Sequence, residues 1–296
     1  MNLEKPLREL SVTEILDRSI TLYSQRLLEF FVPFFFGGIL NGVIRHVVGF
    51  LLLPIVLPQT KPERFFQWLT SYLYLLAGLS SALSVSFWII TTVTSGIAVK
   101  YASDLLEKGN ASLGKAFNFT ICKLATFLAA GLISGVLVVL GLLLLVIPGI
   151  IVALIFSLIV PVIIIEDRGV FKSLERSRRL VDRSWWKTFA VLLLVLIVTA
   201  FFSIIGEAIS IFFGAFRDLA SALAAAFIQP IYPLSLTLLY YSMRIKEAQP
   251  LQQAGYKPPV APVFAEQAQF CAYCGQTLPP DALFCPKCGN RIERYS

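Results

Sequence analysis

Charged side chains are scarce in this chain. Asp, Glu, Lys and Arg supply 15% of its 296 residues, whereas soluble domains carry about 25%. Hydrophobic residues make up 57%, and the mean hydropathy is +0.76. A water-soluble globule of this composition would expose large apolar patches and aggregate. The composition therefore excludes soluble, disordered and collagen-like chains, and it predicts an integral membrane protein.

Groups that could carry catalysis are also scarce. His46 is the only histidine, so a Ser-His-Asp or Cys-His arrangement would have to use it. It follows Arg45 toward the far end of an apolar run, where an interfacial, hydrogen-bonded role is favoured over catalysis. The sequence has neither G-x-x-x-x-G-K-[ST] nor G-x-G-x-x-G as a phosphate-binding loop. We therefore expect no enzymatic activity and assign no catalytic residue.

Long apolar runs dominate the first 245 residues. A bilayer core is about 30 Å thick, so about 20 helical residues cross it. The run 124–165 is long enough for two crossings, and Pro148-Gly149 predicts a tight turn between them. The run 68–99 has no convincing turn signal and predicts one long, tilted helix. The fold class is an all-α bundle of six membrane spans, within 30–57, 68–99, 124–165 (two spans), 188–216 and 219–243.

Lys and Arg are distributed unevenly between the connecting segments. With six spans and a cytoplasmic N-terminus, 21 of the 25 Lys and Arg residues lie in inner segments and three in outer loops. Arg45 is the one that remains within a span. Positive charge is concentrated on the cytoplasmic side of membrane proteins. The distribution predicts a multi-pass protein of the cell membrane that contacts the lipid bilayer and has both termini in the cytoplasm.

Amphipathic segments precede the first, third and fifth spans, at 11–27, 111–122 and 169–185. Ser11 and Glu14 have the spacing of a capping box, which predicts a helix start. The third segment is basic, and basic amphipathic helices bind membrane surfaces, so we expect interfacial helices. Their recurrence is compatible with a loose pseudo-repeat, although any multi-span chain needs re-entry segments. The apolar face of the third segment is predicted to contain Val170, Phe171, Leu174, Val181 and Trp185.

The composition changes after the last span. Residues 246–268 are rich in Pro, Gln, Ala and Gly and show no helical period, which predicts a flexible linker. The chain therefore divides into a cytosolic amphipathic N-terminal segment (1–29), a six-span domain (30–245), this linker and a small C-terminal module (269–296).

Four of the five cysteines lie in the C-terminal module. They form two C-x-x-C pairs, Cys271 with Cys274 and Cys285 with Cys288, separated by ten residues. Four thiolates close a tetrahedral shell around one structural Zn²⁺ ion, and iron is the alternative because the same geometry suits it. So short a segment cannot build a hydrophobic core, and metal binding would drive its folding. The motif is similar to the short zinc ribbon appended to many prokaryotic membrane proteins.

A few polar residues and prolines lie inside the predicted spans. Glu207 lies near the far end of the fifth span, where a functional role and a structural one at the wet boundary are both open. Broken helices and intramembrane acids are typical of transport paths. The other candidates are a serine cluster in the second span (Ser80, Ser81, Ser84 and Ser86) and Pro230 and Pro233 in the sixth.

Residues 147–187 carry a resemblance to a known family. Its motifs are Pro148-Gly149-Ile150, Pro161, Glu166, Ser173-Leu174-Glu175-Arg176-Ser177 and Trp185-Trp186-Lys187. In these residues the chain resembles the membrane domain of bacterial glycerophosphodiester phosphodiesterases. The catalytic part of that family is a soluble barrel with paired histidines and metal-binding carboxylates, and this sequence has no such barrel. The resemblance implies a stand-alone membrane module and carries over no active-site residue.

Two functions of different classes fit these observations. The first is a non-catalytic membrane protein whose cytosolic zinc ribbon binds a protein partner or regulates the membrane domain. The alternative is a transporter or permease-like protein for a lipid or small solute, which a water-accessible cavity beside the intramembrane polar residues would favour. Nucleic-acid binding is disfavoured, because the ribbon itself carries few positive charges, Lys287, Arg291 and Arg294.

Overall fold

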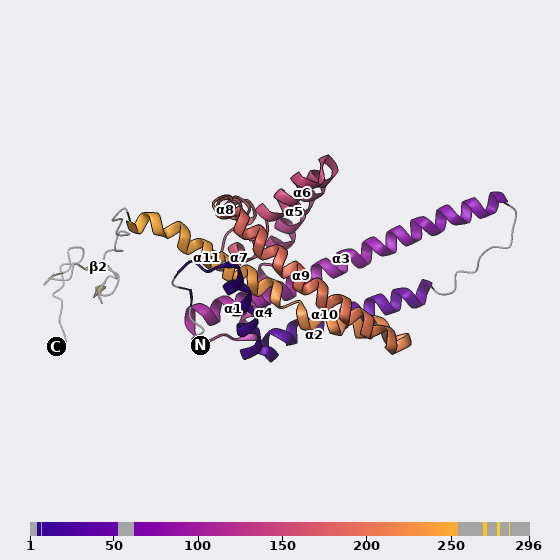
Figure 1. Cartoon of the computed structure of the whole chain (residues 1–296), viewed down its shortest axis with the longest axis horizontal. Helices are drawn as coiled ribbons and strands as arrows, with labels where there is room; N and C mark the ends of the chain where they lie inside the picture. Colours follow the sequence, from indigo (N-terminus) through magenta and orange to yellow (C-terminus); the bar gives the residue numbers. More distant parts are fainter. Residues whose placement is uncertain are drawn as a thin grey trace. The chain divides into compact units, whose positions relative to one another are not determined.

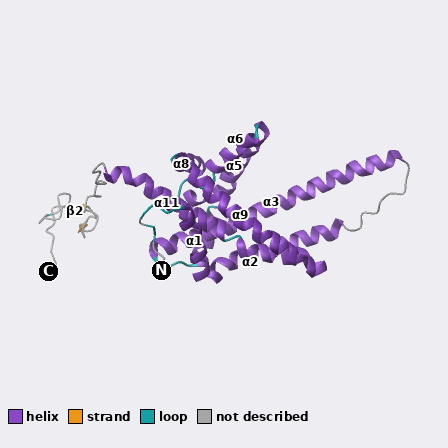
Figure 2. Cartoon of the chain, in the orientation of Figure 1, coloured by secondary structure: helices purple, strands orange, loops and turns teal. Residues whose placement is uncertain are grey.

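Helices follow one another through short connections in this computed structural model, which describes residues 5–6, 8–52, 62–253, 269–270, 277–278 and 284. Contacts between residues divide the chain into two units, 1–247 and 248–296. The first unit is helical (Figure 2). In the second, β1 (Gln269–Phe270) pairs with β2 (Thr277–Leu278) in an antiparallel ladder.

The order of helices in Figure 1 agrees with the order of the predicted spans. Six stretches of the described residues are long and apolar enough to cross a membrane, and the second lies within a single helix, as expected. The helices are α1 (Val12–Gln25), α2 (Leu27–Leu52), α3 (Pro62–Lys108), α4 (Leu113–Cys122), α5 (Leu124–Leu144), α6 (Val146–Ile155), α7 (Ile159–Ile165), α8 (Val170–Asp182), α9 (Trp185–Ser210), the short 3₁₀ helix η1 (Ile211–Phe216), α10 (Arg217–Ile228) and α11 (Ile231–Gln253).

The predicted capping box starts α1. The Ser11 hydroxyl accepts a hydrogen bond from the Glu14 amide at 3.2 Å, and the Glu14 carboxylate accepts one from the Ser11 amide at 2.9 Å. Both bonds satisfy amide groups that the first turn of a helix leaves without partners. This local prediction is confirmed.

Apolar residues of the amphipathic helices α1 and α8 pack against protein, whereas Phe117 and Ile121 of α4 are exposed. In α1, Ile15 and Leu22 are buried, and in α8, Leu174 and Val181 are buried together with two serines. Phe171, which was predicted to belong to the apolar face of a membrane-surface helix, is 78% exposed and does not pack against the bundle. The physical reason is that α8 packs on the bundle through a face centred on Ser173, Ser177 and Leu180, small enough for close approach.

The hairpin of α5 and α6 turns at Leu145, which has an extended backbone, and not at Pro148-Gly149 as predicted. Pro148 lies in the first turn of α6, where its missing N–H removes no helical hydrogen bond. Gly149 instead permits close packing, because a Cβ added to it would lie 2.5 Å from the Leu142 Cγ and 2.8 Å from the Leu142 amide nitrogen of α5. The sequence-based prediction placed the turn three residues too late, because Gly149 allows α5 and α6 to pack closely and is not part of a turn.

Two of the six spans are broken. The fourth is interrupted between α6 and α7, where the Ile155 carbonyl accepts a hydrogen bond from the Ser177 hydroxyl of α8 at 2.6 Å. The sixth is interrupted at Gln229 and Pro230, between α10 and α11. A helix break leaves backbone groups without partners in the helix, and the Ser177 hydroxyl supplies a partner for one of them.

Segments that were predicted to share the cytoplasmic side meet at one end of the bundle. Lys187, at the start of α9, pairs with Glu9 near the N-terminus at 2.8 Å. Lys123, between α4 and α5, pairs with Asp167 after α7 at 2.6 Å. Contacts over such large sequence separations require these ends to lie together.

Helix α11 extends to Gln253, so it covers the first residues of the segment predicted as a flexible linker from 246. An ion pair with Arg176, described below, holds Glu247 in this part of the helix. The sequence shows no apolar period here, and a search for such a period does not detect an ion pair. The remaining linker residues, 254–268, lie outside the described residues.

Candidate functional site

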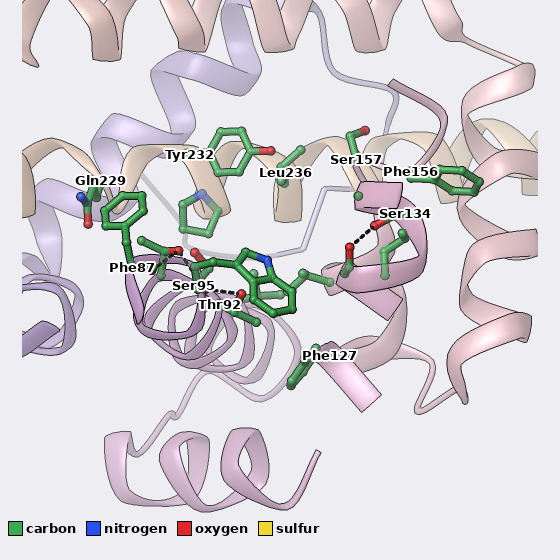
Figure 3. Close-up of a pocket in the computed structure, with 18 of the residues that line it drawn as sticks. Phe87, Thr92, Ser95, Phe127, Ser134, Phe156, Ser157, Gln229, Tyr232 and Leu236 are labelled. Atoms are coloured by element: carbon green, nitrogen blue, oxygen red, sulfur yellow. Dashed lines mark hydrogen bonds between the residues drawn. The ribbon is translucent and has the colours of Figure 1, made fainter. Parts of the chain in front are cut away.

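A cavity of about 770 Å³ lies inside the helical unit, here called the central cavity (Figure 3). Its walls come from α3, α5, α6, α9 and α11, among other elements. Thr92 and Ser95 of α3 lie across it from Tyr232 of α11 and from Ser134 of α5. Apolar and aromatic side chains complete the walls, and none of the lining residues is charged.

The hydroxyl groups of the central cavity are largely satisfied by their own helices. Thr92 Oγ1 donates to the Trp88 carbonyl at 2.7 Å, and Ser134 Oγ donates to the Gly131 carbonyl at 3.1 Å. A hydroxyl whose proton is already donated offers only acceptor lone pairs to a ligand. The wall is therefore weakly polar, and it suits an apolar chain better than a charged solute.

Both helix breaks lie at the wall of the central cavity. Phe156 and Ser157 belong to the interruption between α6 and α7, and Gln229 belongs to the one between α10 and α11. Phe87 and Val139, which also line it, are 45% and 55% exposed. Because wall residues are exposed, the cavity opens to the outside of the bundle.

A second hollow of about 290 Å³, here called the outer pocket, adjoins the central cavity. The two share lining residues, among them Phe34, Thr91 and Gln229. In contrast to the central cavity, the outer pocket is lined by two charged residues, Arg45 and Glu207.

The charged residues of the outer pocket are paired with neighbours in the first turn of α10. Arg217 donates to the Glu207 carboxylate at 2.8 Å, and Arg45 lies 3.6 Å from the nearest Asp218 oxygen. The second distance exceeds that of a hydrogen bond. Glu207, a predicted candidate, is thus both paired and part of a pocket wall.

Other residues singled out from the sequence lie apart from these hollows. Ser80, Ser81, Ser84 and Ser86 donate to carbonyls of α3 and line neither hollow, and His46 is exposed. The hydroxyl residues of this helix that line the central cavity, Thr91, Thr92 and Ser95, lie further along it. The sequence alone does not tell these cavity-lining hydroxyls from Ser80 and its neighbours. That distinction requires knowing which face of α3 is turned toward α5 and α11.

At the opposite end of the bundle, Arg176 of α8 joins three elements, an arrangement here called the arginine clamp. Its guanidinium donates to Glu166 at 2.8 Å and, through two nitrogens, to Glu247 at 2.8 and 2.6 Å. The Tyr240 hydroxyl also donates to Glu166 at 2.8 Å. The side chains of Arg176 and Glu166 are 12% and 10% exposed.

The arginine clamp shifts the ionisation of its members. Burial alone would raise the pKa of Glu166, but hydrogen bonds from Arg176 and Tyr240 and the charges of Arg176 and Arg168 outweigh it, so the pKa is lowered. The hydrogen bonds to Glu247 and Glu166 outweigh the burial of Arg176 and raise the pKa of its guanidinium. Both groups are therefore held in their charged forms.

The predicted metal ligands, Cys271, Cys274, Cys285 and Cys288, lie outside the described residues. The strands around the first pair are described, and Phe270 lies opposite Thr277 in their ladder. The first C-x-x-C pair thus lies, in the sequence, between two strands that pair with each other. The donor set of four thiolates fits Zn²⁺, so the residues present are compatible with one structural ion.

Comparisons with known proteins agree with this division of the chain. Residues 270–292 match the family model of a zinc-ribbon domain. Residues 109–240 match a domain of unknown function, DUF7847. This match covers α4 to α10 and the first ten residues of α11, and neither family is that of the glycerophosphodiester phosphodiesterases. No curated protein and no solved structure matches the chain.

We expect Arg176→Leu to destabilise the helical unit by about 3–5 kcal/mol, because it leaves two carboxylates without their shared cation in a mostly buried site. Thermal or denaturant unfolding of the purified protein in detergent measures the loss. Arg178→Leu is the matched control on the same helix: its side chain is 69% exposed and lies 3.6 Å from Asp182. The control should change stability by less than about 1 kcal/mol, and equal effects of the two variants would contradict a special role for the arginine clamp.

Acid should weaken the same site. Because the pKa of Glu166 is lowered in the folded protein, its contribution to stability is fully present above the ordinary Glu pKa and disappears as the pH falls through the lowered value. Melting temperatures of the wild type and Glu166→Gln, measured from neutral to acidic pH, should therefore differ most near neutrality and converge in acid. A constant difference across this range would show that the charge of Glu166 is not what stabilises the fold.

Proposed function

We propose that this chain is a multi-pass membrane protein that binds a lipid-like molecule inside its helical bundle and acts as a transporter or permease-like protein for it. The central cavity is the observation that supports this function best. Its size, its uncharged wall and its exposed wall residues Phe87 and Val139 suit an apolar molecule that enters from the lipid. Of the two functions predicted from the sequence, the transporter or permease-like one is thus favoured over a membrane domain with a dry, purely structural bundle.

Membrane insertion is part of the proposal. Six helical stretches of suitable length and hydropathy support it, and so does the meeting of the Lys- and Arg-rich segments at one end, through pairs such as Lys187–Glu9. This end would lie in the cytoplasm together with both termini, in the cell membrane. The outer pocket, with Arg45 and Glu207, would then lie toward the exterior.

The broken helices support movement of a ligand over static storage. Breaks between α6 and α7 and between α10 and α11 both touch the central cavity. Discontinuous helices line the substrate sites of many transporters, because unwound backbone can change conformation beside a ligand. We propose no enzymatic activity, since binding and release of an intact molecule need no catalytic group.

Filling the central cavity should abolish ligand binding. A Cβ added at Gly135, a lining residue of α5, meets nothing within 4 Å, so Gly135→Phe places its ring in the cavity without a backbone clash. We expect at least about tenfold weaker binding of a fluorescent single-chain fatty acid to the purified protein, or about 1.4 kcal/mol.

Gly78→Phe is the matched control for Gly135→Phe. Gly78 also has open space at its Cβ position and lines neither hollow. It should bind the probe as the wild type does. Equal binding by all three proteins would place the ligand elsewhere and would remove the support for a transport function.

A second function is favoured by the zinc-ribbon match at residues 270–292. We propose that the ribbon is a cytosolic module that binds a protein partner or regulates the membrane domain. Helix α11 supplies Tyr232 to the cavity wall and continues to Gln253, from which the chain leads to the ribbon. The cavity and the ribbon are therefore consecutive along the chain, and one protein can carry both functions.

Metal analysis of the full chain tests the ribbon. We expect one zinc ion per wild-type chain and its loss from Cys271→Ser/Cys274→Ser, because two thiolates cannot close the coordination shell. The exposed Cys122 provides the control, since Cys122→Ser should keep the zinc. Partners recovered with the wild type and lost with the double variant would support an interaction module, whereas unchanged metal content in the double variant would refute the site.

A further inference from the structure

The two hollows form one site with a gradient of polarity. Along α9, Thr199 lines the central cavity, Ser203 lines both hollows and Glu207 lines the outer pocket. These residues are spaced by four, about one helical turn each. Helix α2 shows the same order, from Phe34 at the junction to Arg45 in the outer pocket. An amphiphile that follows these helices would have its chain in the central cavity and its head group in the outer pocket.

The charges of the outer pocket limit the chemistry of that head group. The pocket wall has one cation, Arg45, and one anion, Glu207. A purely anionic head group would be attracted by the first and repelled by the second, while an uncharged one would gain no charge interaction from either. A zwitterion complements both.

Arg45 is suited to the anionic half of such a head group. Its nearest carboxylate oxygen, on Asp218, lies at 3.6 Å, so its guanidinium donors are not committed to a hydrogen bond with that residue. A guanidinium binds phosphate through two parallel hydrogen bonds. Asn41 and Gln229, which also line the outer pocket, add amide groups that can bind the remaining phosphate and glycerol oxygens.

We propose that the outer pocket binds the zwitterionic head group of an aminophospholipid, with its phosphate at Arg45 and its primary ammonium at Glu207, while an acyl chain occupies the central cavity. This inference rests on the proposed function and adds the ligand class and its orientation. In the proposed topology the head group lies at the outer side of the membrane, so the lipid is taken from the outer leaflet.

The same four charges could serve only to fix the start of α10. Arg217 and Asp218 are consecutive, and each reaches a different helix, through Glu207 and Arg45 respectively. This structural role makes a distinct prediction: Asp218→Asn should then have the same effect as Arg45→Gln, since each removes one side of the same pair. Asp218 and Arg217 do not line the outer pocket, so they are suitable control positions.

The experiment compares three single-chain lipids of equal chain length on the purified full chain: lysophosphatidylethanolamine, lysophosphatidylglycerol and monoacylglycerol. We expect the wild type to bind the first about tenfold more tightly than either of the others. Arg45→Gln should weaken both phospholipids by about tenfold and leave monoacylglycerol unchanged. Glu207→Gln should remove the preference for the ethanolamine head group over the glycerol one.

The controls decide between binding and structure. Asp218→Asn and Arg217→Gln should retain the preference for lysophosphatidylethanolamine, and a loss equal to that of Arg45→Gln or Glu207→Gln would overturn the proposal. Equal affinities of the wild type for the three lipids, all abolished by Gly135→Phe, would overturn the head-group assignment and leave the proposed function intact. If none of the three lipids binds, the proposed function fails as well.

Discussion

The pairing of Arg176 with Glu166 and Glu247 is the contact on which the arrangement of the helical unit depends most. One guanidinium, 12% exposed, holds the end of α7 and the later turns of α11 against α8 through hydrogen bonds of 2.6–2.8 Å. A charge so far removed from water is stable only with hydrogen-bonded counterions. Because two carboxylates meet one cation, the relative positions of three helices are fixed at the end of the bundle where the basic segments gather.

Hydropathy and helix length were sufficient to predict the six long apolar helical stretches, since both depend on local composition. The helix start at Ser11 and Glu14 was equally predictable, because a capping box is complete within four residues. The turn at Leu145, the break after Ile155 and the buried face of α8 were not. Each depends on a contact distant in sequence, such as the Ser177 hydroxyl on the Ile155 carbonyl, and no local pattern encodes such a partner.

The sequence predicted residues of the candidate site only where a charged side chain lies in an apolar run, because such a charge is energetically costly in a membrane. Glu207 was a candidate because a charge in an apolar run is rare, while Arg45 was noted only as the basic residue within a span; both line the outer pocket. Thr92 and Ser95 were missed, while Ser80 and its neighbours were favoured without lining either hollow. Hydroxyls in a helix can satisfy themselves on their own carbonyls, so their presence does not indicate which face borders a cavity.

Helix α11 contributes to both the central cavity and the arginine clamp. Tyr232 and Pro233 form part of the central cavity wall, Glu247 completes the arginine clamp, and the helix ends at Gln253 before the chain that leads to the ribbon. This helix is deeply packed in the bundle, with Leu234, Leu239 and Tyr240 fully buried. A well-packed core is bistable rather than continuously deformable. The cavity wall can therefore move with α11 only if Glu247 moves as well, which requires breaking two charge-assisted hydrogen bonds to Arg176 or carrying α8 along. The wall of the central cavity and the arginine clamp are thus parts of one helix, so the proposed movement of a ligand would involve both.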